Sequence, residues 1–291
     1  MRDIASELRM LARRLPFDSE RLLSILQRRT AGKAFLRSAK WILQVVGGRN
    51  DVASQTSISD GYVFVSKTEC KDGGLDGWCS DRVAYWQDSA YQPLLAQMRR
   101  GQPRLDLLAA AQAVRLTALS DPLILEVGCG SGYYSEVLSC LLQKRIRYVG
   151  VDYSRAMIRL ARKRYRTAGF LVGDAAALPF DSSSVDVVLN GTSLMHILEY
   201  KKAIEESQRV GRHWCIFHTV PILERGPTRL MKKNAYGGPT VEIIFNEDQL
   251  CRQFTDAGLR IEHVLDSIPY NLEAVLGERT CTKTDVCRVI T

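Results

Sequence analysis

The sequence predicts an α/β protein built around a Rossmann-like, mostly parallel sheet. Residues 123–127 form an apolar run with little alternation, which is typical of a strand covered on both faces. A glycine-rich turn follows at 128–132, then a helical stretch and a second apolar strand that ends in Asp152. The 22 residues between Gly130 and Asp152 leave room for one turn, one helix and one strand. This is the element order of a mononucleotide-binding unit.

The turn and the acid after the second strand both suit a nucleoside ligand. Gly128, Gly130 and Gly132 stand at every second position, so no Cβ atom keeps a ligand away from the backbone, and positive φ angles are allowed. The following helix directs its free N–H groups to the same place. The carboxylate of Asp152 can accept hydrogen bonds from both hydroxyls of a ribose.

A third apolar strand at 170–172 extends the pattern and brings a family resemblance with it. It ends in Gly173-Asp174-Ala175, and Leu178-Pro179-Phe180 follows shortly after. Together with Glu126-x-Gly-x-Gly-x-Gly and Asp152, this series resembles the class I S-adenosylmethionine-dependent methyltransferases, of the methyltransferase domain type 11 or 25. The resemblance covers residues 121–265, about half of the chain.

The main competing family is the Rossmann domain that binds a nicotinamide or flavin dinucleotide. Its fingerprint is G-x-G-x-x-G, which accommodates a pyrophosphate. The turn here reads G-x-G-x-G and is followed by Tyr133 and Tyr134. The spacing therefore favours the methyltransferase family.

The resemblance implies S-adenosylmethionine as cofactor and a set of residues around it. Asp152 would bind the ribose, Asp174 and the Ala175 N–H the adenine, and Glu126 a water or the aminoacyl ammonium. Either aspartate could instead be a helix cap or a turn residue. The complete expected cofactor set is Glu126, Gly128, Cys129, Gly130, Gly132, Asp152, Tyr153, Met157, Asp174, Ala175 and Asn190.

Two histidines are candidates for general-base catalysis. His196 follows the fourth predicted strand, where the family places substrate-facing groups, and imidazole titrates near neutrality. The alternative for His196 is a hydrogen bond to the cofactor or the loop. His218, at the end of the fifth strand, is the second candidate. The segment 190–196 lacks the Asn/Asp-Pro-Pro-aromatic pattern of base methylation, and the chain has no Pro-Cys nucleophile, which favours an oxygen acceptor.

Two segments are expected to cover the acceptor. The helix at 78–100 carries Trp86, Gln87 and Tyr91, although both aromatic residues could simply belong to the core. An insertion at 221–245 carries Arg229 and Tyr236 among several basic residues. These cations could bind a phosphate or carboxylate of the substrate, or could be solvated.

The chain is expected to divide into a basic helical arm and linker at 1–60, a helical cap segment at 61–120 and the methyltransferase domain at 121–291. Its sheet should have seven strands, with 282–290 as an antiparallel last strand between the fifth and sixth. Residues 1–49 hold eleven Lys or Arg against four Asp or Glu, which is +7 of the net +8. Such an arm could touch RNA or an anionic membrane, or pack on the body or on a second subunit in a homo-oligomer.

The composition also indicates whether the protein binds a metal and in which compartment it is found. The eight cysteines include no C-x-x-C pair, so no metal site is expected and free thiols in a reducing compartment are favoured. No apolar run approaches the ~18 residues of a membrane span, and the N-terminus lacks a signal-peptide core, so a cytoplasmic location is expected.

The sequence thus predicts O-methylation of a small-molecule hydroxyl, on a sugar or a specialised metabolite. An RNA methyltransferase that uses the basic arm is the enzyme alternative. A cofactor-binding regulator without turnover is the non-enzyme alternative.

Overall fold

The apolar strand at 123–127 lies in the middle of a sheet, with strands on both sides of it. This arrangement is seen in a computed structural model that describes residues 59–71, 75–143, 146–268 and 270–290. Residues 59–291 form one compact unit. The basic arm, and with it the expected contacts of that arm with RNA, a membrane or a second subunit, lies outside the described residues.

The main sheet has the seven strands that the sequence predicts. In spatial order they are β4 (Gly169–Val172), β3 (Arg147–Asp152), β2 (Leu123–Val127), β5 (Val185–Gly191), β6 (Gly211–Leu223), β10 (Thr280–Val289) and β9 (Leu259–Asp266). All neighbouring pairs from β4 to β6 are parallel, whereas β10 is antiparallel to both β6 and β9. The expected antiparallel last strand, between the fifth and the sixth, is confirmed. The expected mixed, mostly parallel Rossmann-like sheet is therefore present.

Helices cover both faces of this sheet, and their beginnings follow local sequence rules. They are α5 (Asp81–Arg99), α6 (Leu105–Leu116), α7 (Tyr134–Leu142), α8 (Arg155–Arg164), α9 (Tyr200–Val210) and α10 (Glu247–Asp256). The Ser154 hydroxyl accepts a hydrogen bond from the Met157 N–H at the start of α8, as expected of an N-cap. Asn246 caps α10 in the same way, and Gly258 follows that helix with φ of 78°.

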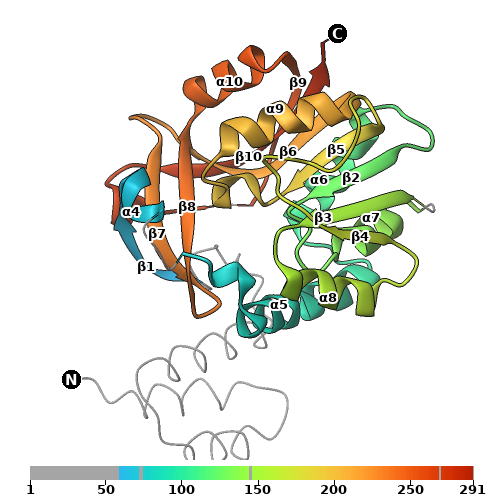
Figure 1. The fold of residues 1–291 in the computed structure, drawn as a ribbon, viewed down its shortest axis with the longest axis horizontal. Coiled ribbons are helices and arrows are strands. Elements are labelled where there is room, and N and C mark those ends of the chain that lie inside the picture. Colours follow the sequence, from blue (N-terminus) through green and yellow to red (C-terminus); the bar gives the residue numbers. More distant parts are fainter. Residues whose placement is uncertain (1–58, 72–74, 144–145, 269, 291) are drawn as a thin grey trace, which may run out of the picture. The chain divides into compact units, whose positions relative to one another are not determined.

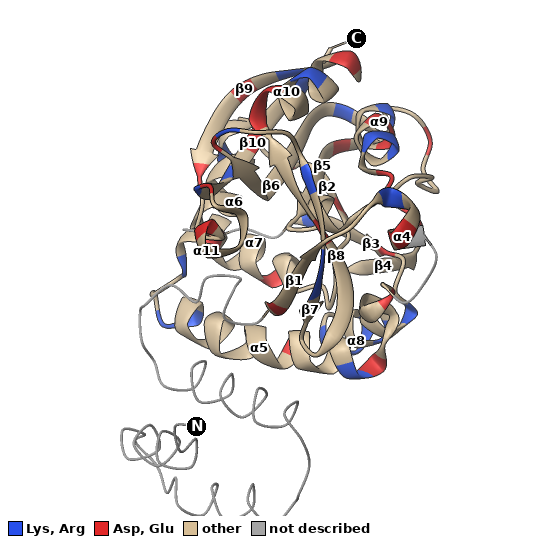
Figure 2. Cartoon of the chain, turned by 90° about the vertical axis from the view of Figure 1, so that its left-hand side faces the viewer, with Lys and Arg blue, Asp and Glu red and all other residues tan. Residues whose placement is uncertain are grey.

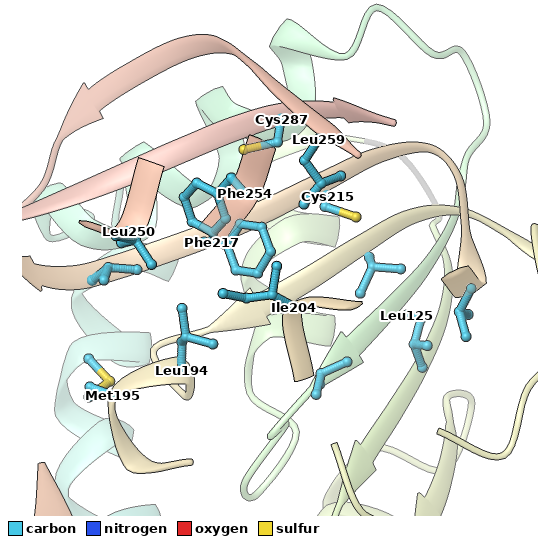
Figure 3. Packing of buried hydrophobic residues seen from close by; sticks show 14 of the residues in the cluster. Leu125, Leu194, Met195, Ile204, Cys215, Phe217, Leu250, Phe254, Leu259 and Cys287 are labelled. Carbon is cyan, nitrogen blue, oxygen red and sulfur yellow. The ribbon is translucent and has the colours of Figure 1, made fainter. Parts of the chain in front are cut away.

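The core is divided between the two faces of the sheet. Leu125 and Val127 of β2 belong to a cluster with residues of α9 and α10, while Ile124 belongs to a second cluster on the other face with Leu138 of α7. Figure 3 shows the first cluster from close by; the rings of Phe217 and Phe254 stack at 4.4 Å in it. Strand β2 is thus buried on both faces, which explains why its sequence does not alternate.

The insertion at 221–245 has a regular structure that the sequence analysis did not foresee. Strand β6 continues to Leu223, and β7 (Arg229–Ala235) and β8 (Gly238–Asn246) form an antiparallel hairpin. The two turn residues, Tyr236 and Gly237, have φ of 51° and 77°, the left-handed conformation that a tight hairpin turn requires. The hairpin is joined to the main sheet where the last two residues of β6 pair with the end of β8.

The hairpin gains a third strand around residues 62–65, for which the sequence indicates a short strand. β1 (Ser59–Phe64) pairs antiparallel with β7, so the segment 61–120 starts as a strand and only then becomes helical. Figure 1 shows β1, β7 and β8 to one side of the main sheet, next to the short helix α4 (Lys67–Lys71). Two further short elements lie in the connections between the larger ones: the 3₁₀ turn η2 (Gly77–Cys79) and the helix α11 (Glu273–Leu276).

Charged residues of both signs are mixed over the described surface. In Figure 2, blue and red segments alternate along α9 and α10, whereas the charged residues of α8 are all basic. This agrees with the small net charge of the sequence beyond residue 49. Among the helices of the described residues, none is both long and apolar enough to pass through a bilayer.

Candidate active site

The glycine turn between β2 and α7 has the conformation that its sequence predicts. Gly128, Gly130 and Gly132 have φ of 71°, 52° and 80°, values that residues with a side chain rarely adopt. A Cβ atom on Gly128 would lie 2.3 Å from Cβ of Ser193, and one on Gly132 would lie 2.7 Å from the Phe170 ring. Both space and backbone therefore require glycine here.

Asp152 lies at the end of β3 and holds the turn in place. Its Oδ2 accepts a hydrogen bond from the Gly130 N–H at 2.8 Å, and its Oδ1 accepts one from the Ser154 N–H at 2.8 Å. Burial raises the pKa of this carboxyl to about 6, and the two backbone hydrogen bonds act in the opposite direction. Each oxygen keeps a second lone pair, so both can still accept from ribose hydroxyls.

Glu126 lies on β2, one strand away from Asp152, and is almost completely buried. It accepts a hydrogen bond from the Tyr148 hydroxyl, and a Cβ atom on Gly191 would lie 2.4 Å from its Oε1. Burial raises the pKa of Glu126 well above its usual value, with a smaller contribution from the charge of Asp152. The expected contact of Glu126 with a ligand ammonium stays a prediction.

Two other expected cofactor residues direct their side chains into the protein. Cys129 packs in a buried cluster with Phe170, so only its backbone belongs to the surface of the turn. Asn190 is fully buried and donates from Nδ2 to the Ser207 hydroxyl at 3.2 Å. The expected contacts of both residues with the cofactor stay predictions.

The expected adenine-binding residues differ in their exposure. Tyr153 is half exposed beyond β3, whereas Met157 is buried against Ala84 of α5. Asp174 is exposed, and its Oδ1 accepts from the Ala176 N–H at 2.9 Å. Asp174 therefore has the turn role that the sequence left open, while its second oxygen can still meet an adenine amino group. Ala175 is partly buried beside it, packed on the main core cluster.

His196 ends the short 3₁₀ turn η3 (Leu194–His196) after β5, and among the described residues only its Nδ1 has a hydrogen-bond partner. Its Nδ1 lies 2.7 Å from the Val241 carbonyl oxygen, which can only accept, so Nδ1 carries the proton. Burial, with the positive charge of Lys233, lowers the pKa of His196 to about 4. The imidazole is therefore neutral near pH 7 and presents Nε2 as a hydrogen-bond acceptor.

His218 has a different environment. Its Nδ1 lies 2.9 Å from the Thr284 hydroxyl and its Nε2 lies 2.9 Å from the Thr219 hydroxyl. The side chain is buried, and burial lowers its pKa to about 4. Since both ring nitrogens have partners, the geometry supports His196 over His218 as the base.

The expected lid residues separate into two groups. Gln87 reaches over the turn, where its Nε2 would lie 3.0 Å from a Cβ atom on Gly130, and Tyr91 stacks on Tyr133 at 4.0 Å. In contrast, Trp86 packs edge-on against Tyr85, its neighbour in the chain.

The two expected residues of the hairpin, Tyr236 and Arg229, lie in different surroundings. Tyr236, at the hairpin turn, contacts the ring of Trp78 at 5.9 Å, and Trp78 contacts His196 at 5.0 Å. Arg229 lies instead over Phe64 at the far edge of the small sheet. Trp78 was missed by sequence reasoning; the available signal was a single tryptophan at the start of the predicted lid helix, in a glycine-rich stretch.

No metal centre is seen in the part of the chain that the structure describes, since no three His, Cys, Asp or Glu side chains come together there. The eight cysteines are free thiols.

Comparison with known proteins gives the same family as the motifs. Residues 125–217 match the family model of a methyltransferase domain. The chain is 40% identical over 91 residues to the phthiotriol/phenolphthiotriol dimycocerosates methyltransferase of Mycobacterium tuberculosis, which is 31% of this chain and 33% of that protein. It is 32% identical over 127 residues to the demethylmenaquinone methyltransferase of Lactococcus lactis, which is 40% of this chain and 50% of that protein.

A solved structure shows the same fold over a larger part of the chain. The 1,6-didemethyltoxoflavin-N1-methyltransferase of Burkholderia thailandensis covers 80% of this chain and 93% of its own, at 15% identity and a TM-score of 0.50. The curated sequence relatives, by contrast, match over about a third to a half of their own length. The matched region contains the glycine turn, Asp152, Asp174 and His196, and residues 125–217 are thus similar to the methyltransferase domain of class I S-adenosylmethionine-dependent enzymes.

Proposed function

We propose that this protein transfers a methyl group from S-adenosylmethionine to a hydroxyl group of a small molecule, with His196 as the base. The observation that carries the choice of acceptor atom is the hydrogen bond from His196 Nδ1 to the Val241 carbonyl. It fixes the tautomer and leaves Nε2 with a lone pair for the proton of a hydroxyl.

The residues at the strand ends fit the cofactor. The turn presents a backbone without side chains, and Asp152 fixes it from the neighbouring strand. Two buried polar atoms beside the turn, Oε1 of Gln87 and Oγ of Ser131, have no hydrogen-bond partner within the described residues. Unpaired buried polar atoms are costly, and a polar nucleoside would satisfy them.

The work of the chain in this reaction is mainly positioning. When bound, the cofactor supplies a methyl group on a positively charged sulfur, which is already activated. The turn and Asp152 would hold the nucleoside, and holding two reactants in line can contribute roughly 7–11 kcal/mol to lowering the barrier. His196 would take up the hydroxyl proton at Nε2, while its Nδ1 hydrogen bond keeps the ring in position.

The small-molecule acceptor is supported by the names of two relatives. The proteins of M. tuberculosis and L. lactis are named for the methylation of phthiotriol/phenolphthiotriol dimycocerosates and of demethylmenaquinone. Neither name refers to a nucleic acid. We propose more narrowly that the acceptor is a sugar or a specialised metabolite, and an acceptor screen tests this.

The experiment is an acceptor screen with S-adenosylmethionine labelled in its methyl group. The full chain is incubated with hydroxylated small molecules and, separately, with RNA, and the position of the label in each product is read by mass spectrometry. The proposal requires an O-methyl product whose formation is lost in His196→Gln. Label in RNA would establish the RNA alternative, and cofactor binding without transfer to any acceptor would establish the non-catalytic one.

A further inference from the structure

A buried cation lies where helix electrostatics alone would not favour it. Arg104 is the N-cap residue of α6, at the positive end of the helix dipole. Its side chain is 23% exposed, and that of its partner Asp106 is 4% exposed. Two hydrogen bonds join them: Nε donates to Oδ1 at 2.7 Å and Nη2 donates to Oδ2. The pair fixes the plane of the guanidinium.

The surroundings of Arg104 belong to the candidate acceptor site. The guanidinium carbon lies 5.9 Å from the centroid of the Tyr91 ring, and Tyr91 stacks on Tyr133, the residue that follows the glycine turn. Burial raises the pKa of Tyr236 well above its usual value, and the charge of Arg104 acts against that rise. The cation thus lies beside Tyr91 of the lid helix, which stacks on the residue that follows the glycine turn.

Fold stability does not explain a largely buried ion pair in this position. Charged pairs in a protein interior cost desolvation, and apolar replacements of similar volume are often as stable. The Arg104–Asp106 pair uses Nε and Nη2, so Nη1 lies outside it. An acid that reaches Nη1 would meet one oriented cation beside the aromatic ring of Tyr91. That combination suits a flat acid, because guanidinium donors match the geometry of a carboxylate.

We propose that Arg104, oriented by Asp106, binds the carboxylate of a planar, aromatic acceptor and so selects the substrate of this enzyme. This inference rests on the proposed methyltransferase function and adds the chemical class of its acceptor. Arg104 contacts the substrate in this account, whereas Asp106 is a positioning residue that fixes the guanidinium.

The test compares acids with their neutral amides. Binding of 4-hydroxybenzoate and quinoline-2-carboxylate, and of the corresponding primary amides, is measured by calorimetry on the full chain saturated with S-adenosylhomocysteine. We expect the wild type to bind at least one acid about tenfold more tightly than its amide. Arg104→Gln should reduce that preference to less than about threefold. Arg100→Gln removes an equal charge from an exposed site nearby and should leave the preference unchanged.

A second variant distinguishes a loss of acid binding from misfolding. Arg104→Gln leaves the buried Asp106 carboxylate without its cation, so the double variant Arg104→Gln/Asp106→Asn, which is neutral on both sides, is measured alongside. Unchanged affinity for S-adenosylhomocysteine shows that each variant is folded. The proposal is overturned if the wild type does not distinguish acid from amide, or if the double variant keeps the preference. Failure of the wild type to bind S-adenosylhomocysteine would instead refute the proposed function itself.

Discussion

The carboxylate of Asp152 accepts a hydrogen bond from the N–H of Gly130 at 2.8 Å, across 22 residues of sequence. The acid at the end of β3 thus fixes the conformation of the turn that follows β2. The same carboxylate has lone pairs left for a ribose, so one residue both shapes the nucleoside site and is expected to bind the ligand.

Replacement of Asp152 by alanine should therefore weaken cofactor binding through both roles. We expect the affinity for S-adenosylhomocysteine to fall at least about tenfold, equivalent to about 1.4 kcal/mol. Calorimetry on the purified variant measures it. Asp181→Ala, which removes an exposed carboxylate from the loop after β4, is the matched control and should bind as the wild type does. An unchanged affinity in Asp152→Ala would remove this residue from the site.

The raised pKa of Asp152 has a consequence for stability. Because the folded-state pKa of about 6 exceeds the ordinary value of 3.8, the folded protein holds the proton more tightly than the unfolded chain. The stabilising contribution is present below about pH 4 and is lost as the pH rises through 6. Asp152→Asn should gain about 2–3 kcal/mol relative to the wild type between pH 4 and pH 7. Denaturant unfolding at both pH values measures this; a pH-independent difference would contradict the assignment.

His196 is expected to act without titrating near neutrality. Since its pKa is about 4, the rate at saturating cofactor should stay flat between pH 6 and 8 and fall only toward pH 4. His196→Gln keeps a donor for the Val241 carbonyl but lacks a base, so kcat should drop about 10²–10⁴-fold. Affinity for S-adenosylhomocysteine should not change. His263→Gln, on an exposed position of β9, should retain full activity; equal losses in both variants would refute the assignment.

The hairpin contains a buried ion pair, and its disruption should destabilise the folded protein. Lys233 and Glu242 have side chains that are 3% and 0% exposed, and the second oxygen of Glu242 accepts from the Tyr270 hydroxyl at 2.7 Å. Lys233→Met leaves that carboxylate without its cation and should cost about 3–5 kcal/mol of unfolding free energy. Denaturant titration measures this loss.

A compensating double variant tests whether the unpaired charge of Glu242 causes the loss of stability. Lys233→Met/Glu242→Gln keeps the acceptor for Tyr270 and removes the charge, so it should recover at least half of the lost stability. If the double variant is no more stable than the single one, the loss comes from packing of the lysine stem.

Local sequence determined the nucleotide-binding half of this protein. The strand β2, the three glycines and the acid 22 residues later were predictable because each depends on neighbours in the chain: apolar residues on both faces, positive φ angles, and one helix between two strands. The caps Ser154 and Asn246 followed from the same short-range rules. The antiparallel strand β10 was predicted from the resemblance to the methyltransferase family and not from periodicity.

Only the tertiary structure decided how the acceptor side is built. Strand β1 pairs with β7, so that Asp60 lies opposite Asn234, and no local pattern indicates a partner so far along the chain. The contacts of Trp78 with His196 and of Arg104 with Tyr91 likewise join different elements. Local propensity fixes the element and its caps, whereas pairing and side-chain contacts depend on packing between segments that are distant in sequence. That is why the glycine turn could be read from the sequence, while Trp78 and Arg104 became visible only in the fold.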